Sequence, residues 1–167
     1  MDLALLILRV VVGLLVAGHG AQKLFGWFKG PGIPGFTGWL ASMAFRRAHV
    51  WAWIAGICEF GGGLLLALGL FSPLGSLGIG ASMVTAIAKV HWPKIWVTEG
   101  GLELPLTNLA VVTAVGIAGP GAISLDAMFG TALPLWLAAL GVVAVLAGWI
   151  IAMVTSASRP RQGTATR

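Results

Sequence analysis

Charged residues are scarce in this sequence. Only 9% of the 167 residues are charged and 58% are hydrophobic, with a mean hydropathy of +0.97. An ordinary soluble domain has about 25% charged residues. The composition therefore excludes a soluble protein with a normal surface and predicts a chain embedded in a lipid bilayer. Since a transmembrane helix takes about 20 residues, the length allows five or six spans at most and no separate soluble domain.

The sequence has a single cysteine, and it lacks the residue patterns of several common kinds of binding site. Cys58 stands alone, so an intrachain disulfide and a two-cysteine thiol reaction are impossible. No Cys and His residues have the spacing of a zinc site, and the glycine runs 61–63 and 119–121 lack the context of a phosphate-binding loop. The ten Lys and Arg residues are scattered among apolar runs, unlike the basic stripe that binds nucleic acid. We expect no metal, no covalently bound cofactor and no nucleic-acid partner.

Apolar runs of bilayer length predict five transmembrane helices, at residues 3–27, 51–71, 74–91, 104–119 and 133–154. The Ser72-Pro73 break leaves a very short connection between the second and third spans, which predicts an antiparallel hairpin. Residues 31–44 predict a turn followed by a short interfacial helix. The expected fold is an all-α membrane protein, with a four-helix transmembrane bundle over residues 1–130.

The C-terminal part of the chain predicts an addition to that bundle. Residues 131–155 contain the fifth, C-terminal transmembrane helix, and residues 156–167 are expected to be a disordered basic cytoplasmic tail. No ionisable side chain lies between Leu133 and Ala157, while Gly141 and Gly148 lie two turns apart. We therefore expect this helix to be a peripheral anchor or a contact in a homo-oligomer, outside any binding site.

Basic residues and tryptophans indicate the orientation of the chain. With five spans, nine of the ten Lys and Arg residues fall on one side, and Arg9 lies within the first span. The positive-inside rule then places the N-terminus outside and the C-terminus in the cytoplasm. Six of the eight tryptophans fall at the same cytoplasmic edge, as in an interfacial aromatic belt: Trp27, Trp39, Trp51, Trp53, Trp92 and Trp96.

The predicted spans carry ionisable side chains in spite of the bilayer. Such a side chain at the centre of a helix costs about 2.5–3.5 kcal/mol, so each one implies a partner or a wet cavity. From a rise of about 1.5 Å per residue, His19 and Glu59 lie at matching depth, roughly 12 Å from the cytoplasmic edge. We expect a polar pocket that opens to the cytoplasm. Its candidate ligand-binding residues are His19, Gln22, Lys23, Glu59, Lys89, His91, Glu103 and Asn108.

Glu59 and Arg9 support more specific expectations. Glu59 is either the structural partner of Lys23 or His19, or a group that handles protons or binds a ligand. It is the candidate proton-handling residue, and no catalytic residue is assigned. Arg9 lies near the outer end of the first span, as does Asp126 in the loop after the fourth span. We predict a structural ion pair between Arg9 and Asp126.

A series of short motifs runs in order through residues 3–130. It consists of Leu8-Arg9 with Gly13, His19-Gly20-Ala21-Gln22-Lys23-Leu24-Phe25, Glu59 followed by glycines, Gly69-Leu70, His91, Glu99-Gly100-Gly101-Leu102-Glu103, and Gly119-Pro120-Gly121 with Ser124-Leu125-Asp126-Ala127. The series resembles the DoxX family of small bacterial and archaeal membrane proteins. The resemblance implies a four-helix core in the cytoplasmic membrane and a redox setting. Relatives include the DoxD subunit of a thiosulfate:quinone oxidoreductase, and a membrane component that associates with superoxide dismutase and a sulfurtransferase.

Three functions remain open at this point. The first is a membrane subunit of a quinone-linked oxidoreductase, in which His19 and Lys23 bind the quinone carbonyls, Glu59 passes protons and tryptophans stack on the ring. The second is a membrane docking or assembly protein that recruits soluble thiol or oxidative-stress enzymes to its basic, Trp-lined cytoplasmic face. The third is a small-solute or proton-coupled carrier, although the sequence lacks the internal repeat that is usual in such proteins.

Overall fold

The structure of this chain, a computed structural model, describes residues 1–131, 133 and 135–156. Every regular element in these ranges is helical, which confirms the predicted all-α class. The elements are α1 (Asp2–Phe25), η1 (Trp27–Lys29), α2 (Gly32–Ser42), α3 (Ala48–Leu68), α4 (Ser72–Ala86), η2 (Ile87–His91), η3 (Val97–Glu99), α5 (Glu103–Ala118), α6 (Leu125–Phe129) and α7 (Leu135–Ser156). The predicted disordered tail lies, apart from Ser156, outside the described residues.

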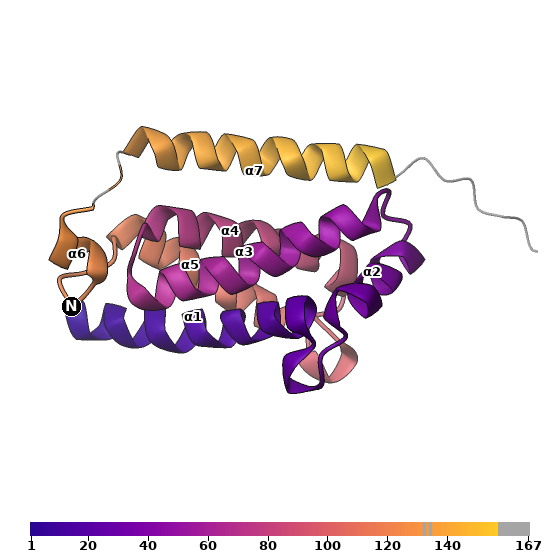
Figure 1. The fold of residues 1–167 in the computed structure, drawn as a ribbon, viewed down its shortest axis with the longest axis horizontal. Coiled ribbons are helices and arrows are strands. Elements are labelled where there is room, and N and C mark those ends of the chain that lie inside the picture. The colour runs from indigo at the N-terminus through magenta and orange to yellow at the C-terminus, as the bar shows by residue number, and fades with distance from the viewer. Residues whose placement is uncertain (132, 134, 157–167) are drawn as a thin grey trace, which may run out of the picture.

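Helices α1, α3, α4 and α5 form an antiparallel bundle, and α7 lies along one side of it (Figure 1). Helix α3 ends at Leu68 and α4 begins at Ser72, so the two form the tight hairpin that the sequence predicts. All four bundle helices contribute to one buried apolar cluster: Val16, Leu66, Ile79, Met83, Val112 and Val115. The centre of the bundle is therefore a packed hydrocarbon core.

Three of the helices are long and apolar enough to cross a membrane. They are α1, α3 and the continuous helical segment Ser72–His91, which combines α4 with the π-helical turn η2. Helix α5 and the segment Ala139–Gly148 of α7 are apolar but shorter. The chain is therefore an all-helical membrane protein, whereas the count of four core spans plus one remains a prediction.

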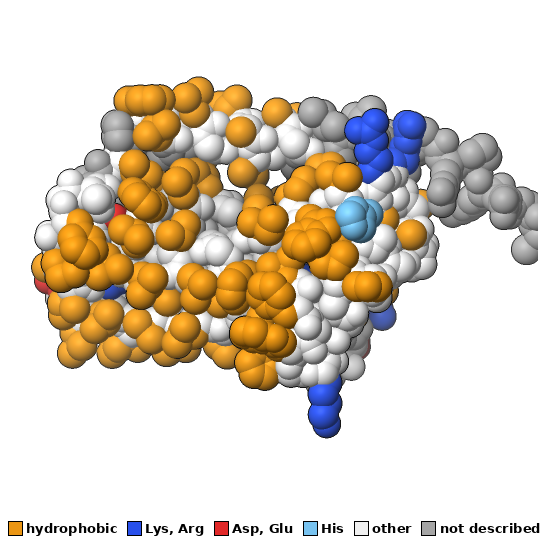
Figure 2. All heavy atoms as spheres, viewed as in Figure 1, with side chains coloured by type: hydrophobic (Ala, Val, Ile, Leu, Met, Phe, Trp, Pro, Cys, Tyr) orange, Lys and Arg blue, Asp and Glu red, His pale blue; other side chains and the backbone are white. Residues whose placement is uncertain are grey.

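The outer surface of the described part is largely hydrophobic, as lipid contact requires. Figure 2 shows apolar side chains covering most of one face of the molecule, while the Lys and Arg side chains that protrude do so at the end where α1 and α7 finish. Helix α1 alone exposes Ile7, Val11, Leu14 and Leu15 to at least half of their accessible area. These residues lie on the stripe of α1 that faces away from the bundle.

Helix α2 covers the beginning of α3 at the basic end of the molecule. The sequence predicts an interfacial helix at 31–44, and α2 occupies most of that range. Its inner face joins the first turns of α3 in a second buried cluster: Ile33, Phe36, Leu40, Phe45, Ala48 and Ala52. This packing holds α2 across the ends of the bundle helices, where it forms part of the wall of a cavity described below.

Glycines bring α1 and α3 into backbone contact. A Cβ atom at Gly63 of α3 would lie 2.5 Å from the backbone N of Ala17 and 2.5 Å from the carbonyl O of Gly13, both in α1. A Cβ at Gly20 would collide in the same way with the backbone of Phe60. Small residues allow this close approach in lipid, where association of helices depends on packing. The crossing sets the rotation of α1 against α3, and hence which polar side chains of the two helices meet.

At the end of the bundle where the N-terminus lies, Asp126 of α6 ties the hairpin between α3 and α4 to the rest of the chain (Figure 1). Its carboxylate accepts hydrogen bonds from the backbone N–H of Phe71 at 2.9 Å and of Ser72 at 3.1 Å, at the beginning of α4. The hydroxyl groups of Ser72 and Thr131 also donate to it, at 3.2 and 2.8 Å. A negative charge at a helix N-terminus is favourable, because the unpaired N–H groups and the helix dipole are directed at it.

Arg9 lies beside this junction but is not the direct partner of Asp126. The Arg9 side chain is fully buried, and its Nη2 donates to the carbonyl O of Ile123. Among the described residues, Arg9 and Asp126 form no salt bridge, which corrects the predicted ion pair. Both instead contact Gly69: the guanidinium fills the space where a Cβ would be, and the backbone N–H of Asp126 donates to the Gly69 carbonyl at 2.9 Å. Gly69 can make both contacts because it has no side chain, and a glycine adopts its positive φ of 62° without strain.

We expect Gly63→Ala to destabilise the protein by about 1–3 kcal/mol, because the new Cβ forces α1 and α3 apart. Gly61→Ala is the matched control, since a Cβ at Gly61 has no atom within 4 Å. Thermal unfolding of the detergent-solubilised protein, followed by tryptophan fluorescence, measures both. Equal midpoints for the two variants would contradict the close crossing.

Because the Asp126 carboxylate is ionised and hydrogen-bonded in the folded protein, we expect the protein to lose stability in acid. Burial raises the pKa of this carboxyl, but the hydrogen bonds from Thr131, Ser72 and Phe71 outweigh burial and hold the pKa below its ordinary value. The carboxylate therefore stabilises the fold above its unfolded pKa of about 3.9, and this contribution disappears as the pH falls through the lower folded pKa. We expect Asp126→Asn to cost about 1–3 kcal/mol at neutral pH and to weaken the dependence on pH below about 4.

Thermal midpoints between about pH 6 and pH 3 test this expectation, with Glu99→Gln as the control at an exposed carboxyl. The same acid dependence in wild type and Asp126→Asn would show that Asp126 does not anchor the hairpin.

Candidate functional site

A cavity of about 880 Å³ opens at the basic end of the bundle. Its walls come from the last turns of α1, from α2, from the first half of α3, from the second half of α4 with η2, and from α7. Ligand pockets in proteins commonly have volumes of about 300–1,000 Å³. The polar side chains in its wall are Gln22, Lys23, Glu59, Ser82, Thr85, Lys89 and His91.

Three helices meet at one ionised cluster in this wall. Nζ of Lys23 in α1 forms a salt bridge with Oε1 of Glu59 in α3. The hydroxyl of Ser82 in α4 donates to the same oxygen at 2.5 Å. The Glu59 side chain is only 3% exposed and that of Lys23 is 25% exposed, so the carboxylate is buried while the ammonium remains accessible from the cavity. Of the two partners that the sequence offers for Glu59, the structure thus pairs it with Lys23 and not with His19.

The cluster has hydrogen-bonding capacity left over. Among the described residues, Oε2 of Glu59 is buried and accepts no hydrogen bond. A lysine ammonium carries three donors, and the salt bridge to Glu59 engages one of them. The Nζ atom also lies 5.1 Å from the centre of the Phe36 ring, where a cation is attracted to the aromatic face. The pair therefore has an acceptor and donors that no described residue uses.

Five of the eight predicted ligand-binding residues lie in the wall of this cavity: Gln22, Lys23, Glu59, Lys89 and His91. The π-helical turn η2 at the end of α4 carries the last two of them. Nδ1 of His91 lies 2.7 Å from the carbonyl O of Gly100, so the Nδ1–H tautomer donates to that carbonyl. Single π-helical turns often occur at functional sites.

His19 is not part of this wall, which corrects the prediction for this residue. It is exposed on α1 beside the lipid-facing positions Leu14 and Leu15, and its Nδ1 lies 3.2 Å from Oε1 of Gln22. Four residues of a helix turn the chain by about 400°, so His19 lies about 40° from Lys23 around the helix axis. A shared depth along two helices carries no information about the direction in which each side chain points.

Glu103 and Asn108 are also outside the cavity, because α5 contributes nothing to its wall. Helix α5 packs on α4 and contacts α1 on the other side of the bundle. Glu103 begins α5, while Asn108 is buried with its Nδ2 3.9 Å from the sulfur of Met83. The two residues therefore lie on a different face of the bundle from the cavity.

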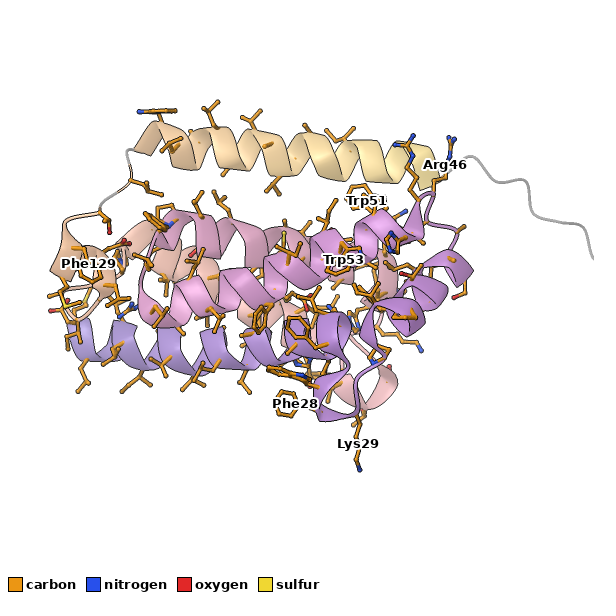
Figure 3. All side chains as sticks on the ribbon, viewed as in Figure 1. Phe28, Lys29, Arg46, Trp51, Trp53 and Phe129 are labelled. Atoms are coloured by element: carbon orange, nitrogen blue, oxygen red, sulfur yellow. The ribbon has the colours of Figure 1, made fainter. Side chains whose placement is uncertain are left out.

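Two parts of the wall were not predicted as site residues. The first is a group of aromatic side chains from the α2 region and the start of α3: Phe36, Trp39, Phe45 and Trp51. Figure 3 shows Trp51 between α3 and the C-terminal part of α7. The large apolar residues at positions 36, 39, 40 and 43 recur at helical spacing, which is the signal that an interfacial helix also has an inward face.

The second part is α7, which the sequence predicts to be peripheral. Ala144, Val145 and Gly148 of this helix line the cavity, so that expectation is wrong. The prediction relied on ionisable residues to mark the site, and α7 closes the cavity with small and apolar side chains. The run of Gly and Ala residues between 139 and 148 is the signal that could have indicated contact with the bundle.

Comparison with known proteins assigns the chain to a family. The DoxX family model matches residues 4–92, which include α1, α2, α3 and α4 together with Lys23, Glu59 and Ser82. Neither the comparison with curated proteins nor that with solved structures gave a match. Because the family model covers more than half of the chain, the protein belongs to the DoxX family of membrane proteins.

Proposed function

We propose that this protein is the membrane subunit of a quinone-linked oxidoreductase and that it binds the quinone head group in the cavity beside Glu59. The observation that carries the proposal is the Lys23–Glu59–Ser82 cluster in the wall of a cavity that is lined mostly by apolar and aromatic side chains. A few polar groups in an apolar, aromatic wall are typical of sites for small ligands.

The chemistry of the cluster suits both redox forms of a quinone. The oxidised ring presents carbonyl oxygens, which can accept from the Lys23 ammonium. The reduced ring presents hydroxyl groups, which can donate to Oε2 of Glu59, the buried carboxylate oxygen with no partner among the described residues. Reduction of a quinone takes up two electrons from the donor enzyme and two protons at the ring oxygens. A carboxylate at this position can receive and return such protons.

The rest of the wall suits the faces of the ring. Trp39 stacks on Phe36 with ring centroids 5.6 Å apart and planes inclined by 22°, so the cavity has a flat aromatic surface at the level of α2. Trp51 adds a second indole from α3. Aromatic surfaces of this kind favour offset stacking on a planar ligand.

We propose that the cavity opens toward the cytoplasm. Lys23, Lys29, Arg46, Arg47, Lys89 and Lys94 belong to segments at one end of the bundle, and Figure 3 shows Lys29 and Arg46 there. By the positive-inside rule this end is cytoplasmic, with the N-terminus of the chain outside. Soluble redox enzymes would then reach the cavity from the basic face, which also accounts for the second function that the sequence leaves open.

We expect Glu59→Gln to weaken quinol binding about tenfold, because it replaces a charge-assisted hydrogen bond by a neutral one. Quenching of tryptophan fluorescence by ubiquinol and menaquinol analogues measures binding directly, since Trp39 and Trp51 lie in the wall of the cavity. Glu103→Gln is the matched control, an identical change in a residue outside the cavity.

Two results would contradict the proposal. One is the absence of saturable binding of both quinone classes to the wild-type protein in native lipid. The other is an equal loss of affinity in Glu59→Gln and Glu103→Gln, which would show that the effect does not arise in the cavity.

A further inference from the structure

A second, smaller cavity lies farther along the bundle, between α4, α5 and α7. It has a volume of about 360 Å³. Leu77 and Gly80 of α4, Leu109 and Gly116 of α5, and Leu146 of α7 are among the residues of its wall. Small residues on α4 and α5 leave room there that larger side chains would fill.

The two cavities adjoin each other. Ala81 of α4 and Val145 of α7 line both of them. Helix α7 packs tightly on α4 at Gly141, where a Cβ would collide with the side chain of Leu77. At Gly148, by contrast, a Cβ would have no atom within 4 Å, and this residue faces the larger cavity. The seam between α4 and α7 is therefore tight near Gly141 and loose toward Gly148.

The wall of the smaller cavity offers very little to a polar ligand. Thr113 already donates to the carbonyl O of Leu109 at 2.7 Å. Ser76 is 8% exposed, and its hydroxyl has no partner among the described residues. One hydroxyl in an apolar wall cannot satisfy a polar or charged molecule, and burying such a molecule there would be costly. An occupant must consequently be hydrocarbon.

We propose that the smaller cavity holds the hydrocarbon tail of the quinone whose head group occupies the larger one. This inference rests on the proposed function and adds the substrate class, a quinone with a long isoprenoid tail. Ser82 at the head-group cluster and Ser76 in the smaller cavity are six residues apart on α4, or about 9 Å along the helix. A tail that starts at the cluster and passes Ala81 and Val145 enters the smaller cavity within its first isoprene units.

The test compares two quinones that share one head group and carry either a single isoprene unit or a long isoprenoid tail. The full chain is placed in lipid nanodiscs, and each quinone is dosed by its mole fraction in the lipid, which removes the difference in partitioning. Fluorescence quenching of Trp39 and Trp51 reports occupancy of the head-group cavity. The wild-type protein is expected to bind the long-tailed quinone about tenfold more tightly, because its tail packs against the wall of the smaller cavity and gains van der Waals contacts that the short tail lacks.

Gly116→Leu fills the smaller cavity, because a Cβ at Gly116 lies at an ordinary distance of 3.5 Å from the Cβ of Ser76 and the rest of the side chain extends inward. Gly80→Leu fills it from the opposite wall, where the nearest atom to a Cβ is 3.8 Å away. Gly18→Leu on α1 is the matched control, with no atom within 4 Å and no place in either cavity.

Both filling variants are expected to abolish the preference for the long tail and to leave the affinity for the short-tailed quinone unchanged, while Gly18→Leu preserves both. An unchanged preference in the filling variants would overturn the inference and leave the head-group site intact. Loss of a co-purified phospholipid in these variants without any change in quinone affinity would also overturn it, because the groove would then hold a structural lipid. No binding of either quinone to the wild-type protein would instead refute the proposed function itself.

Discussion

The salt bridge between Lys23 and Glu59 is the interaction on which the account of this protein depends. It places a charge pair from two helices in the wall of a largely apolar cavity, and a third helix supports it through Ser82. Taking such a pair out of water is costly, and the mutual attraction only partly offsets the cost. Apolar residues of the same size would serve packing equally well, which argues that the pair has a task beyond stability. The chemical groups for such a task are Oε2 of Glu59, which has no partner among the described residues, and the ammonium donors of Lys23 that the salt bridge does not engage.

The rest of the fold holds the pair in position. The glycine contacts between α1 and α3 set the rotation at which Lys23 and Glu59 face each other. At the end of the bundle away from the cavity, Asp126 accepts hydrogen bonds from the first N–H groups of α4, and Arg9 fills the space beside Gly69. These contacts join α1, α3, α4 and α6 on the side of the molecule opposite the cavity. The helices can therefore leave a cavity open at one end of the bundle, because the contacts at the other end hold them together.

The sequence was sufficient to predict the helices and to name Lys23 as one of two candidate partners of Glu59, and for a physical reason. Apolar runs of bilayer length have few alternatives to a helix, and the cost of Lys23 and Glu59 in lipid demanded a shared environment. Direction around a helix was harder. His19 and Glu103 lie outside the cavity wall, since depth along a helix depends only on residue count whereas the direction of a side chain depends on tertiary packing. Helix α7 was not predicted as part of the cavity wall, because it lines the cavity with small and apolar residues such as Gly148 and has no ionisable side chain there.

The most direct test of the central claim is photolabelling of the full chain in native lipid with an azido-quinone, followed by identification of the labelled peptides by mass spectrometry. The account predicts labels on α3 around Cys58 and on α4 around Thr85, both in the cavity wall, and competition by unlabelled quinone. Labels confined to the lipid-facing stripe of α1 around Leu15, with no competition, would contradict it.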